Sequence, residues 1–551
     1  PYTTLFRSGI LREAKQQKIF CYIFTCQLNF QANTESQEGT YNIMRLPDLS
    51  HFDGAILLKN TIQYTRIADE LEERIRNSGI PCVNIAQKIP GMGSVMVKNY
   101  EAEYEVVSYL IQNKGARSIN FVSGYPGNPD GEERLRAYCD ALSDNGIKVE
   151  KERIFSGNYS IGSGVRAVQE WLSRNERLPD AYVCANDQMA IGVIEELNRA
   201  GYSVPGDTMV TGFDGDDLCQ AFSPRIATVE TGQHECGSIA VRQLIDAWSG
   251  KAMRTEWVEG SFRKAESCGD YEKGETTGNI CGTFVKESVI LRQTSDFIRN
   301  MSSDFTEAET LEAFYETMKK YIRIGDMSSC YLCMCEMDKV FHRENPEKRN
   351  LIDLKNINTG YTETVTIPVA CHSDSFMAYS AFPSGLVLPE EIESKDEADF
   401  YVVTPVNYHH CCYGYFVSAD SYFSLQSELF YSWVSNVGIA LENIRKWILM
   451  NGLMRRLNDM WIYDTMTKLY NRAGFYYIAE DVLSGMKEKK ADRADKRKRD
   501  RKNGVKTEDD KARSMHIRRK TAEAKNNGKR GKSGGSKVSC RNGSGISGKT
   551  G

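Results

Sequence analysis

The sequence predicts a multidomain α/β protein: a two-lobed, doubly wound parallel sheet, then a smaller α+β domain, then a long helix. Short apolar runs alternate with amphipathic helices up to about residue 270, which is the pattern of a parallel sheet covered by helices. Two helices and a set of strand-like runs occupy 285–425. Apolar residues then recur at spacings of three and four over 426–463, which predicts a helix with a coiled-coil seam.

Turn residues set the boundaries of the first elements. Gly79-Ile80-Pro81 ends one helix, Lys114-Gly115 the next and Asn145-Gly146 the third. The predicted strands and helices alternate in the order 54–58, 67–78, 82–85, 101–113, 118–123 and 132–144. An earlier apolar run, 19–30, predicts a buried strand. Open parallel sheets bind ligands beyond the carboxyl ends of their strands. The loops in which we expect a site follow Val122, Phe155, Cys184 and Gly212.

Charge is distributed unevenly along the 551 residues, whose net charge is −4. Segment 487–551 carries 23 Lys and Arg against 8 Asp and Glu, so the remainder is acidic. An acidic body does not favour nucleic-acid binding, whose electrostatic mark is a basic patch. Segment 487–551 also lacks aromatic residues, so we expect it to be disordered and the product of a misread end. Residues 1–8 (PYTTLFRS) resemble a translated sequencing adaptor and are excluded from the fold.

The chain shows no sign of a membrane or secreted protein. No apolar run reaches the roughly 18 to 20 residues that span a bilayer. The 16 cysteines are scattered within apolar stretches, as small hydrophobic residues are in a reducing compartment. We therefore expect a cytoplasmic protein.

Residues 181–217 resemble the effector-binding core of the lactose-repressor (LacI) family, which is related to periplasmic sugar-binding proteins. FDGAILL (52–58), GIPCVNI (79–85) and GNYSIGSG (157–164) follow the same family in the same order. The resemblance covers 9–270. It implies a periplasmic-binding-protein-like domain that binds a small-molecule effector, such as a sugar or nucleoside.

Carried over position by position, the resemblance implies four ligand-facing residues. Arg134 can fork onto hydroxyls or a carboxylate, and Tyr159 can pack on the flat face of a sugar or base. Asn186 and Asp214 match a polar pair that hydrogen-bonds ring hydroxyls. Asp187 precedes an apolar helical run, so we expect it to cap that helix.

Three of these residues have a structural alternative. Arg134 could form a surface ion pair, Tyr159 could belong to the core, and Asp214 could cap a turn within FDGDD. A strand-end Asp that is usual in the family is Lys98 here, which leaves the ligand class open. No helix-turn-helix precedes residue 9, so we expect no DNA contact by these residues.

The order of elements in 285–425 resembles a GAF-type sensory domain. After a linker at 269–282, helices are expected at 288–301 and 307–321, and strands at 330–335, 364–367, 401–406 and 413–417. Cys333 and Cys335 alternate along a strand, and 409–412 (HHCC) lies where two strands meet. A metal site needs ligands that converge from separate segments. We therefore interpret both groups as buried cysteine beside a polar turn, with no metal.

The helix at 426–463 carries a heptad seam. Its members are Phe430, Val434, Val437, Leu441, Ile444 and Ile448. The phase slips near Asn451-Gly452, after which Leu453, Leu457 and Met460 resume it. This pattern predicts a two-stranded coiled coil, and hence a homodimer. The alternative is one face of a helix packed on its own domain.

Residues 464–475 (DTMTKLYNRAGF) resemble the opening of a GGDEF domain, the bacterial module that condenses two GTP molecules into cyclic di-GMP. Asp464, Thr467, Leu469, Asn471 and Arg472 match its coupling turn, in which Asp464 is expected to cap a helix and Arg472 to pair back onto the turn. This start of the domain covers 464–486. The Gly-Gly-(Asp/Glu)-Glu-Phe loop and the carboxylates for Mg²⁺ are absent, so the Mg²⁺ and GTP of an intact domain are not expected and the chain is predicted to be inactive.

The function expected first is therefore a cytoplasmic, ligand-sensing protein of the diguanylate cyclase (GGDEF) family, in which effector binding regulates cyclic di-GMP synthesis. The alternative is a LacI-type transcriptional regulator whose DNA-binding head lies upstream of these residues. A third possibility is a degenerate GGDEF protein that acts only as a ligand-gated scaffold.

Overall fold

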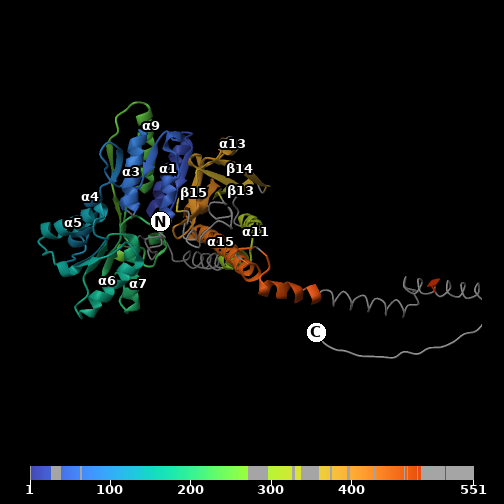
Figure 1. Ribbon diagram of the computed structural model, residues 1–551. Helices are drawn as coiled ribbons and strands as arrows, with labels where there is room; N and C mark the ends of the chain where they lie inside the picture. The colour runs from blue at the N-terminus through green and yellow to red at the C-terminus, as the bar shows by residue number, and fades with distance from the viewer. Residues whose placement is uncertain are drawn as a thin grey trace, which may run out of the picture. The chain divides into compact units, whose positions relative to one another are not determined.

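The computed structural model describes most of the chain up to residue 484. The described ranges are 2–26, 39–62, 65–270, 296–324, 329–336, 359–372, 375–393, 398–426, 428–464, 466–467, 469–480, 482–484 and 515–516. Contacts divide the chain into two compact units, residues 1–450 and 451–551. The first unit holds the two lobes of an α/β domain and a third sheet (Figure 1). Most of the predicted linker at 269–282 and nearly all of the predicted tail at 487–551 lie outside the described residues.

The first lobe is built on a parallel four-stranded sheet in the order β10-β4-β3-β2. Its strands are β2 (Ala55–Leu57), β3 (Cys82–Ile85), β4 (Gly93–Val97) and β10 (Thr255–Val258). The helices α3 (Thr65–Ser78), α9 (Gln233–Trp248) and α1 (Tyr2–Gln16) belong to this lobe (Figure 1). Apolar side chains of β3 and β4 pack against α9 to form its core.

Two glycines let α1 pack closely on α9. A Cβ atom on Gly9 would lie 2.1 Å from the backbone oxygen of His234, and one on Gly237 would lie 2.3 Å from that of Phe6. Phe6 is 1% exposed within this contact. The structure thus places residues 2–8, which the sequence analysis set aside, in the first half of a packed helix.

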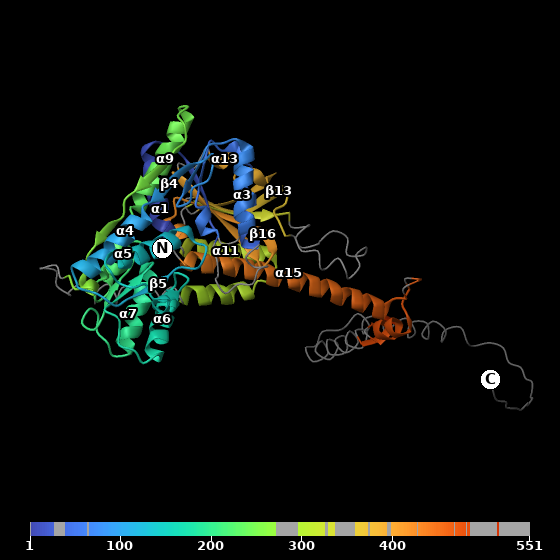
Figure 2. The same cartoon turned by 90° about the vertical axis from the view of Figure 1, so that its left-hand side faces the viewer.

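The second lobe repeats the design of the first. Its parallel sheet has the order β6-β5-β7-β8, formed by β5 (Ile119–Ser123), β6 (Ile154–Ser156), β7 (Ala181–Cys184) and β8 (Met209–Thr211). Its helices are α4 (Asn99–Gln112), α5 (Pro129–Asp144), α6 (Ile161–Ser173) and α7 (Asp187–Arg199). The pair α6 and α7 lies side by side (Figure 2). The six elements predicted over 54–144 are present, with ends within three residues of those expected, but β4 was not predicted.

The chain passes three times between the lobes. It leaves the first lobe after β4, returns after β9 (Thr228–Glu230), and leaves again after β10 to form β11 (Ser261–Arg263), which pairs with β9. Because each crossing follows a strand, the carboxyl ends of both sheets face the region between the lobes. The two-lobed α/β fold that the sequence predicted is therefore present.

A mixed six-stranded sheet forms the third part of the first unit. Its order is β1-β15-β16-β12-β13-β14. The strands are β1 (Cys21–Phe24), β12 (Ser329–Cys335), β13 (Thr364–His372), β14 (Ser375–Pro383), β15 (Phe400–Tyr408) and β16 (Cys411–Ala419). Helical residues 296–306 and α11 (Leu311–Ile324) precede it, and α15 (Glu428–Ile462) follows. The order of elements is the expected one, although β14 was not predicted. The GAF assignment itself stays a prediction.

The strand expected at 19–30 differs from the prediction in length, burial and place. Only Cys21–Phe24 forms a described strand, and its four residues are half-buried. It runs parallel to β15, with Cys21 opposite Phe400 and Phe24 opposite Val403. Its apolar side chains are covered by a small cluster around Leu11 and Leu425. The strand is half-buried because it lies at the edge of the sheet.

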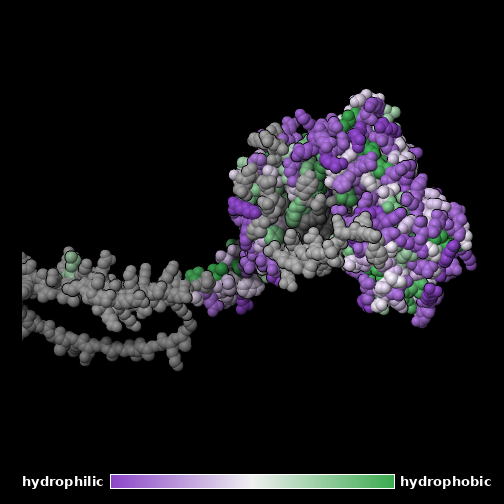
Figure 3. Space-filling model, turned by 180° about the vertical axis from the view of Figure 1, so that it is seen from behind, coloured by the Kyte–Doolittle hydropathy of each residue, from purple (hydrophilic) through white to green (hydrophobic). Residues whose placement is uncertain are grey.

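The expected coiled-coil seam on α15 is wrong for its first half. Phe430, Val437, Leu441 and Ile444 are at most 1% exposed, and they belong to the same core cluster as β12 and β16. The seam therefore packs on its own domain, which was the alternative. Apolar residues further along the helix are exposed: Met454 by 63% and Leu457 by 66%. Apolar side chains gather near this end of α15 in Figure 3.

The second unit, by itself, holds the last turns of α15, a hydrogen-bonded turn and a short helix over 472–480. Tyr463 and Tyr470 form an isolated antiparallel bridge that closes the turn. Within the described residues, no helix is long and apolar enough to cross a membrane.

Candidate ligand-binding site

Polar side chains gather where the carboxyl ends of the two sheets face each other. Asn60, in the loop after β2, donates from Nδ2 to Oδ2 of Asp130 at 3.4 Å. Asp130 lies in the first turn of α5, in the second lobe, and is 7% exposed. Asn99, the first residue of α4, donates to the other oxygen of Asp130 at 2.9 Å. The contact between Asn60 and Asp130 bridges the two lobes at the predicted edge of the sheets, and Asn99 holds Asp130 from within the second lobe.

Arg134 lies at the centre of this group. Its Nε donates to Oδ1 of Asn99 at 3.0 Å, and its Nη1 donates to the backbone oxygen of Ala185 at the end of β7. The guanidinium stacks on the ring of Phe213, with 3.7 Å between its carbon and the ring centre. Arg134 is only 3% exposed. The alternative of a surface ion pair is therefore wrong.

Asp214 forms an ion pair with Arg134, at 3.3 Å between Oδ1 and Nη1. The approach lacks the alignment of a hydrogen bond, since Oδ1 accepts none from the described residues. Burial raises the pKa of Asp214 to about 7, and the guanidinium of Arg134 opposes this rise. Asp214 also has a φ of 110°, a strained value for a residue other than glycine. The turn in FDGDD is capped by Asp216 instead, which accepts from Leu218 N at 3.0 Å.

Tyr159 lies in the second lobe, in the loop before α6, with Arg134 among its charged neighbours. Its hydroxyl donates to Oδ1 of Asn128 at 2.9 Å, and its ring meets Tyr125 edge-on at 5.5 Å. A Cβ atom on Gly124 would lie 2.1 Å from the ring of Tyr159, so only glycine leaves room for it there. The φ of Tyr159 is 63°, in the left-handed region. The ring is half-buried and packs against the core cluster of the second lobe, so the core alternative holds for part of the side chain.

Asn186 holds the helix-capping position that the sequence suggested for Asp187. Oδ1 of Asn186 accepts from Met189 N at 3.0 Å, and its backbone is extended, so Asn186 is the N-cap of α7. Its Nδ2 donates to the backbone oxygen of Tyr159 at 3.1 Å. The cap expected at Asp187 is wrong, because its carboxyl accepts from Oγ1 of Thr228 at 2.6 Å and from Asp216 N at 2.7 Å. Both oxygens of Asp187 thus tie α7 to neighbouring loops.

Lys98 does not join the polar group. Its Nζ pairs with Glu259 at 2.7 Å, next to two of the crossings between the lobes. The strand-end carboxylate that the family pattern would place here is absent. Asp130 supplies a carboxylate from α5 instead, where it receives hydrogen bonds from Asn60 and Asn99.

Sequence reasoning missed Asn60, Asn99, Asp130 and Glu103. Glu103 lies one turn beyond Asn99 on α4 and is 1% exposed. Neither of its carboxyl oxygens accepts a hydrogen bond from the described residues. Burial raises its pKa to about 8, an effect that the nearby Arg134 opposes and Asp214 reinforces. The sequence does place Glu103 among the apolar positions of an amphipathic helix, which could have indicated a buried acid.

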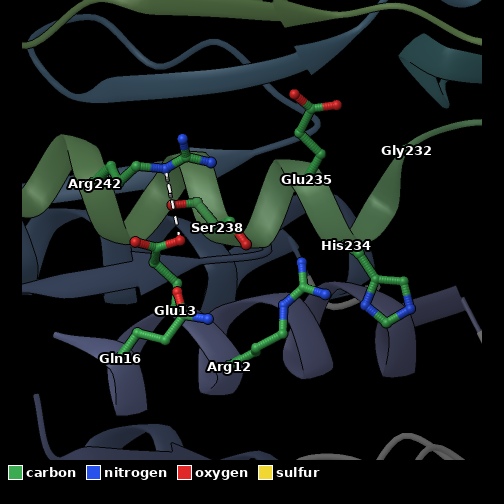
Figure 4. A pocket seen from close by; sticks show the side chains of 8 residues that line it. All are labelled: Arg12, Glu13, Gln16, Gly232, His234, Glu235, Ser238 and Arg242. Atoms are coloured by element: carbon green, nitrogen blue, oxygen red, sulfur yellow. Dashed lines mark hydrogen bonds and ion pairs between the residues drawn. The ribbon is translucent and has the colours of Figure 1, made fainter. Parts of the chain in front are cut away.

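A surface hollow of about 480 Å³ lies away from this group, between α1 and α9. Figure 4 shows that charged and polar side chains line it, with Glu13 and Arg242 paired across it at 3.8 Å. Small-molecule sites are largely apolar and enclosed. The hollow lacks an apolar wall, so we place the candidate site between the lobes, where the buried polar groups converge.

The cysteines and the coupling turn add no second site. Cys333 and Cys335 are buried, and His409 lies in the turn between β15 and β16 with a φ of 50°. Among the described residues, no three His, Cys, Asp or Glu side chains are placed to hold a metal ion.

The coupling turn is held by its own side chains. Oδ1 of Asp464 accepts from Thr467 N at 2.8 Å, and so does not cap a helix. Asn471 caps the helix at 472–480 by accepting from Gly474 N at 2.8 Å. Leu469 contributes through its backbone: its oxygen accepts from Asp464 N at 2.8 Å, and its N donates to Oγ1 of Thr467 at 3.5 Å. For Arg472, no contact back onto the turn is seen within the described part of the chain.

Comparison with known proteins supports the two-lobed domain. Residues 107–261 match the family model of the periplasmic binding protein-like domain. Catabolite control protein A of Priestia megaterium is 30% identical over 213 residues, which is 38% of this chain and 60% of that protein. The repressor CytR of Escherichia coli K12 is 29% identical over 223 residues, 40% of this chain and 62% of that protein. The chain thus spans about 60% of the length of these relatives.

A solved structure of the regulator CelR in complex with cellobiose aligns with 48% of this chain and 79% of its own, at 23% identity and a TM-score of 0.41. The named relatives are a catabolite control protein and an HTH-type transcriptional repressor, not diguanylate cyclases. The function expected first, a diguanylate cyclase acting through cyclic di-GMP, is therefore wrong. Five matched positions in a short turn were too few to identify an enzyme.

Proposed function

We propose that this chain is the effector-sensing part of a LacI-type transcription regulator. A small polar molecule, such as a sugar or nucleoside, binds between the two lobes and controls DNA binding by the intact protein. Such a protein acts in the cytoplasm, as a homodimer.

The observation that carries this proposal is the buried polar group at the facing ends of the two sheets. Arg134 and Asp214 form an ion pair there, and both lie within the stretch that matches the periplasmic binding protein-like domain. Buried charges that are only partly satisfied are costly to a fold. A polar ligand bound here would supply hydrogen bonds to these buried charged groups and so offset the cost of burying them.

The three crossings give a route from binding to signalling. A ligand that contacts both lobes stabilises the arrangement in which the lobes are close together. Asn60 on the first lobe and Asp130 on the second mark where such contacts would form. The change in lobe arrangement is then available to a DNA-binding part of the protein.

A thermal-shift screen of the full chain against sugars, nucleosides and amino acids tests the binding step. We expect at least one compound to raise the melting temperature, and Asp214→Asn to weaken its affinity by about tenfold or more, the equivalent of roughly 1.4 kcal/mol. Glu132→Gln is the matched control, since Glu132 is exposed on the same helix as Arg134. If no compound binds, or if Asp214→Asn binds as well as the wild type, the site is misplaced.

The regulatory step needs the intact gene product. Its affinity for promoter DNA, measured by fluorescence anisotropy with and without the effector, is expected to change by about tenfold, a typical size of coupling between two sites. An effector that binds without changing DNA affinity would contradict the regulatory role while leaving the binding site intact.

A further inference from the structure

The candidate site has an excess of hydrogen-bond acceptors. Oδ1 of Asn60 and both carboxyl oxygens of Glu103 are buried and accept no hydrogen bond from the described residues, while Oδ1 of Asp214 has the 3.3 Å ion pair with Arg134 but no aligned hydrogen bond. Nδ2 of Asn60 donates to Asp130, so Oδ1 of the same amide points away from Asp130. An unpaired buried polar atom costs roughly 1 to 3 kcal/mol. Acceptors of this kind are satisfied by a ligand that brings donors.

The charges in the site point the same way. Asp130, Asp187, Asp214 and Glu103 are the carboxyls of this group. Asp214 has Arg134, Asp187 and Asp130 as its charged neighbours, and Glu103 has Arg134 and Asp214. Arg134 is the cation that lies against Asp214 and Glu103. The lysines next in sequence to Asn60 and Asn99 form ion pairs elsewhere. Lys59 pairs with Asp69 and Glu72, and Lys98 pairs with Glu259.

Three of these acids hold a proton for part of the time near neutral pH, and a second positive charge would release it and leave both oxygens as acceptors. Burial raises the pKa of Asp187 and Asp214 to about 7 and that of Glu103 to about 8. A second positive charge in the site would allow these groups to ionise. An anionic ligand would add to the repulsion instead.

We propose that the effector of this site carries a protonated amine, whose N–H groups donate to Asp214 within reach of Asp130 and Asn60. The inference rests on the proposed ligand-sensing function and narrows its ligand to hydroxylated amines, such as amino sugars or amino nucleosides. Arg134 then orients the hydroxyls, and the amine adds a second positive charge beside Asp214 and Glu103.

Two sets of matched probes test this on the full chain by isothermal titration calorimetry at pH 7. One set is glucosamine, glucose and glucuronate; the other is 5′-amino-5′-deoxyadenosine, adenosine and adenosine 5′-carboxylate. Within at least one set we expect the amine to bind about tenfold or more tighter than the neutral compound, and the acid to bind most weakly. Binding of the amine is also expected to release protons, seen as a dependence of the heat on the buffer.

Asp214→Asn should remove most of the preference for the amine, while Glu132→Gln, which removes an exposed charge from the first turn of α5, should preserve it. Proton release by the wild type provides the same test if Asp214→Asn does not fold. Neutral compounds that bind as well as the amines would overturn the amine inference and leave the sensing function standing. Absence of binding by both amines also overturns it, whereas the sensing function fails only if the wider screen yields no ligand.

Discussion

At the scale of single residues, the buried carboxyl of Glu103 makes stability depend on pH. Its pKa is about 8 in the folded chain and near 4.5 when exposed, so the folded state binds more protons between these values. The free energy of unfolding therefore falls as pH rises from about 4.5 to 8, by up to about 1.4 kcal/mol per pH unit. Asp187 and Asp214 act in the same direction up to about pH 7.

Glu103→Gln removes this group and is expected to stabilise the chain at pH 8 by about 2 to 4 kcal/mol relative to the wild type, with little effect at pH 5. Urea unfolding at pH 5, 6.5 and 8 measures the difference. Glu101→Gln, an exposed acid on the same helix, should leave the slope against pH unchanged. Equal slopes for the wild type and Glu103→Gln would show that Glu103 is not the linked group.

Asn186 is the second residue whose role can be measured apart from any ligand. Loss of its N-cap hydrogen bond in Asn186→Ala should lower the free energy of unfolding by about 1 kcal/mol. Asn186→Ser keeps an oxygen that can accept from Met189 N, so it should lose much less. If both variants match the wild type in urea unfolding, the cap at α7 is not formed as described.

At the scale of elements, α15 tests the corrected account of the heptad seam. Leu441 is fully buried against the third sheet, so Leu441→Ala should cost about 2 to 5 kcal/mol of unfolding free energy. Leu457, 66% exposed, should cost less than about 0.5 kcal/mol when changed to Ala. Urea unfolding measures both. Light scattering measures the molar mass of each variant. If Leu441→Ala abolished a dimer without lowering the free energy of unfolding, the coiled-coil seam would be supported after all.

The elements also show what a sequence can and cannot predict. The helices α3 to α5 were predictable because each has apolar residues on one face and ends at a glycine turn. A spacing of three and four does not say whether the apolar face meets its own sheet or another copy, so the seam of α15 was misassigned. In the site, the family pattern was enough to select Arg134 and Asp214 as candidate site residues. Which of Asn186 and Asp187 caps α7 depended on the backbone conformation of a single residue, which the sequence does not reveal.

At the scale of the whole molecule, β1 links the start of the chain to a sheet formed almost 400 residues later. Its pairing with β15 is parallel and covers Cys21 to Phe24, and Thr25 N adds a bond to the backbone oxygen of Val403 at 2.9 Å. Contacts between such distant segments are formed late and at an entropic cost, so they hold only in the assembled first unit. Local patterns around Cys21 could not identify β15 as the partner.

Ile23→Pro tests this link, because proline removes a backbone donor and fits poorly in a paired strand. Hydrogen exchange followed by mass spectrometry should show faster exchange in β15, while the sheet of the second lobe, β5 to β8, keeps its protection. Ile23→Val is the matched control, since it preserves the backbone and loses one methylene, at a cost of about 1 kcal/mol or less. Unchanged exchange in β15 would mean that its edge is not covered by β1 in solution. Faster exchange in both sheets would instead show that the first unit opens as one cooperative body, in which the sensing lobes and the third sheet share their stability.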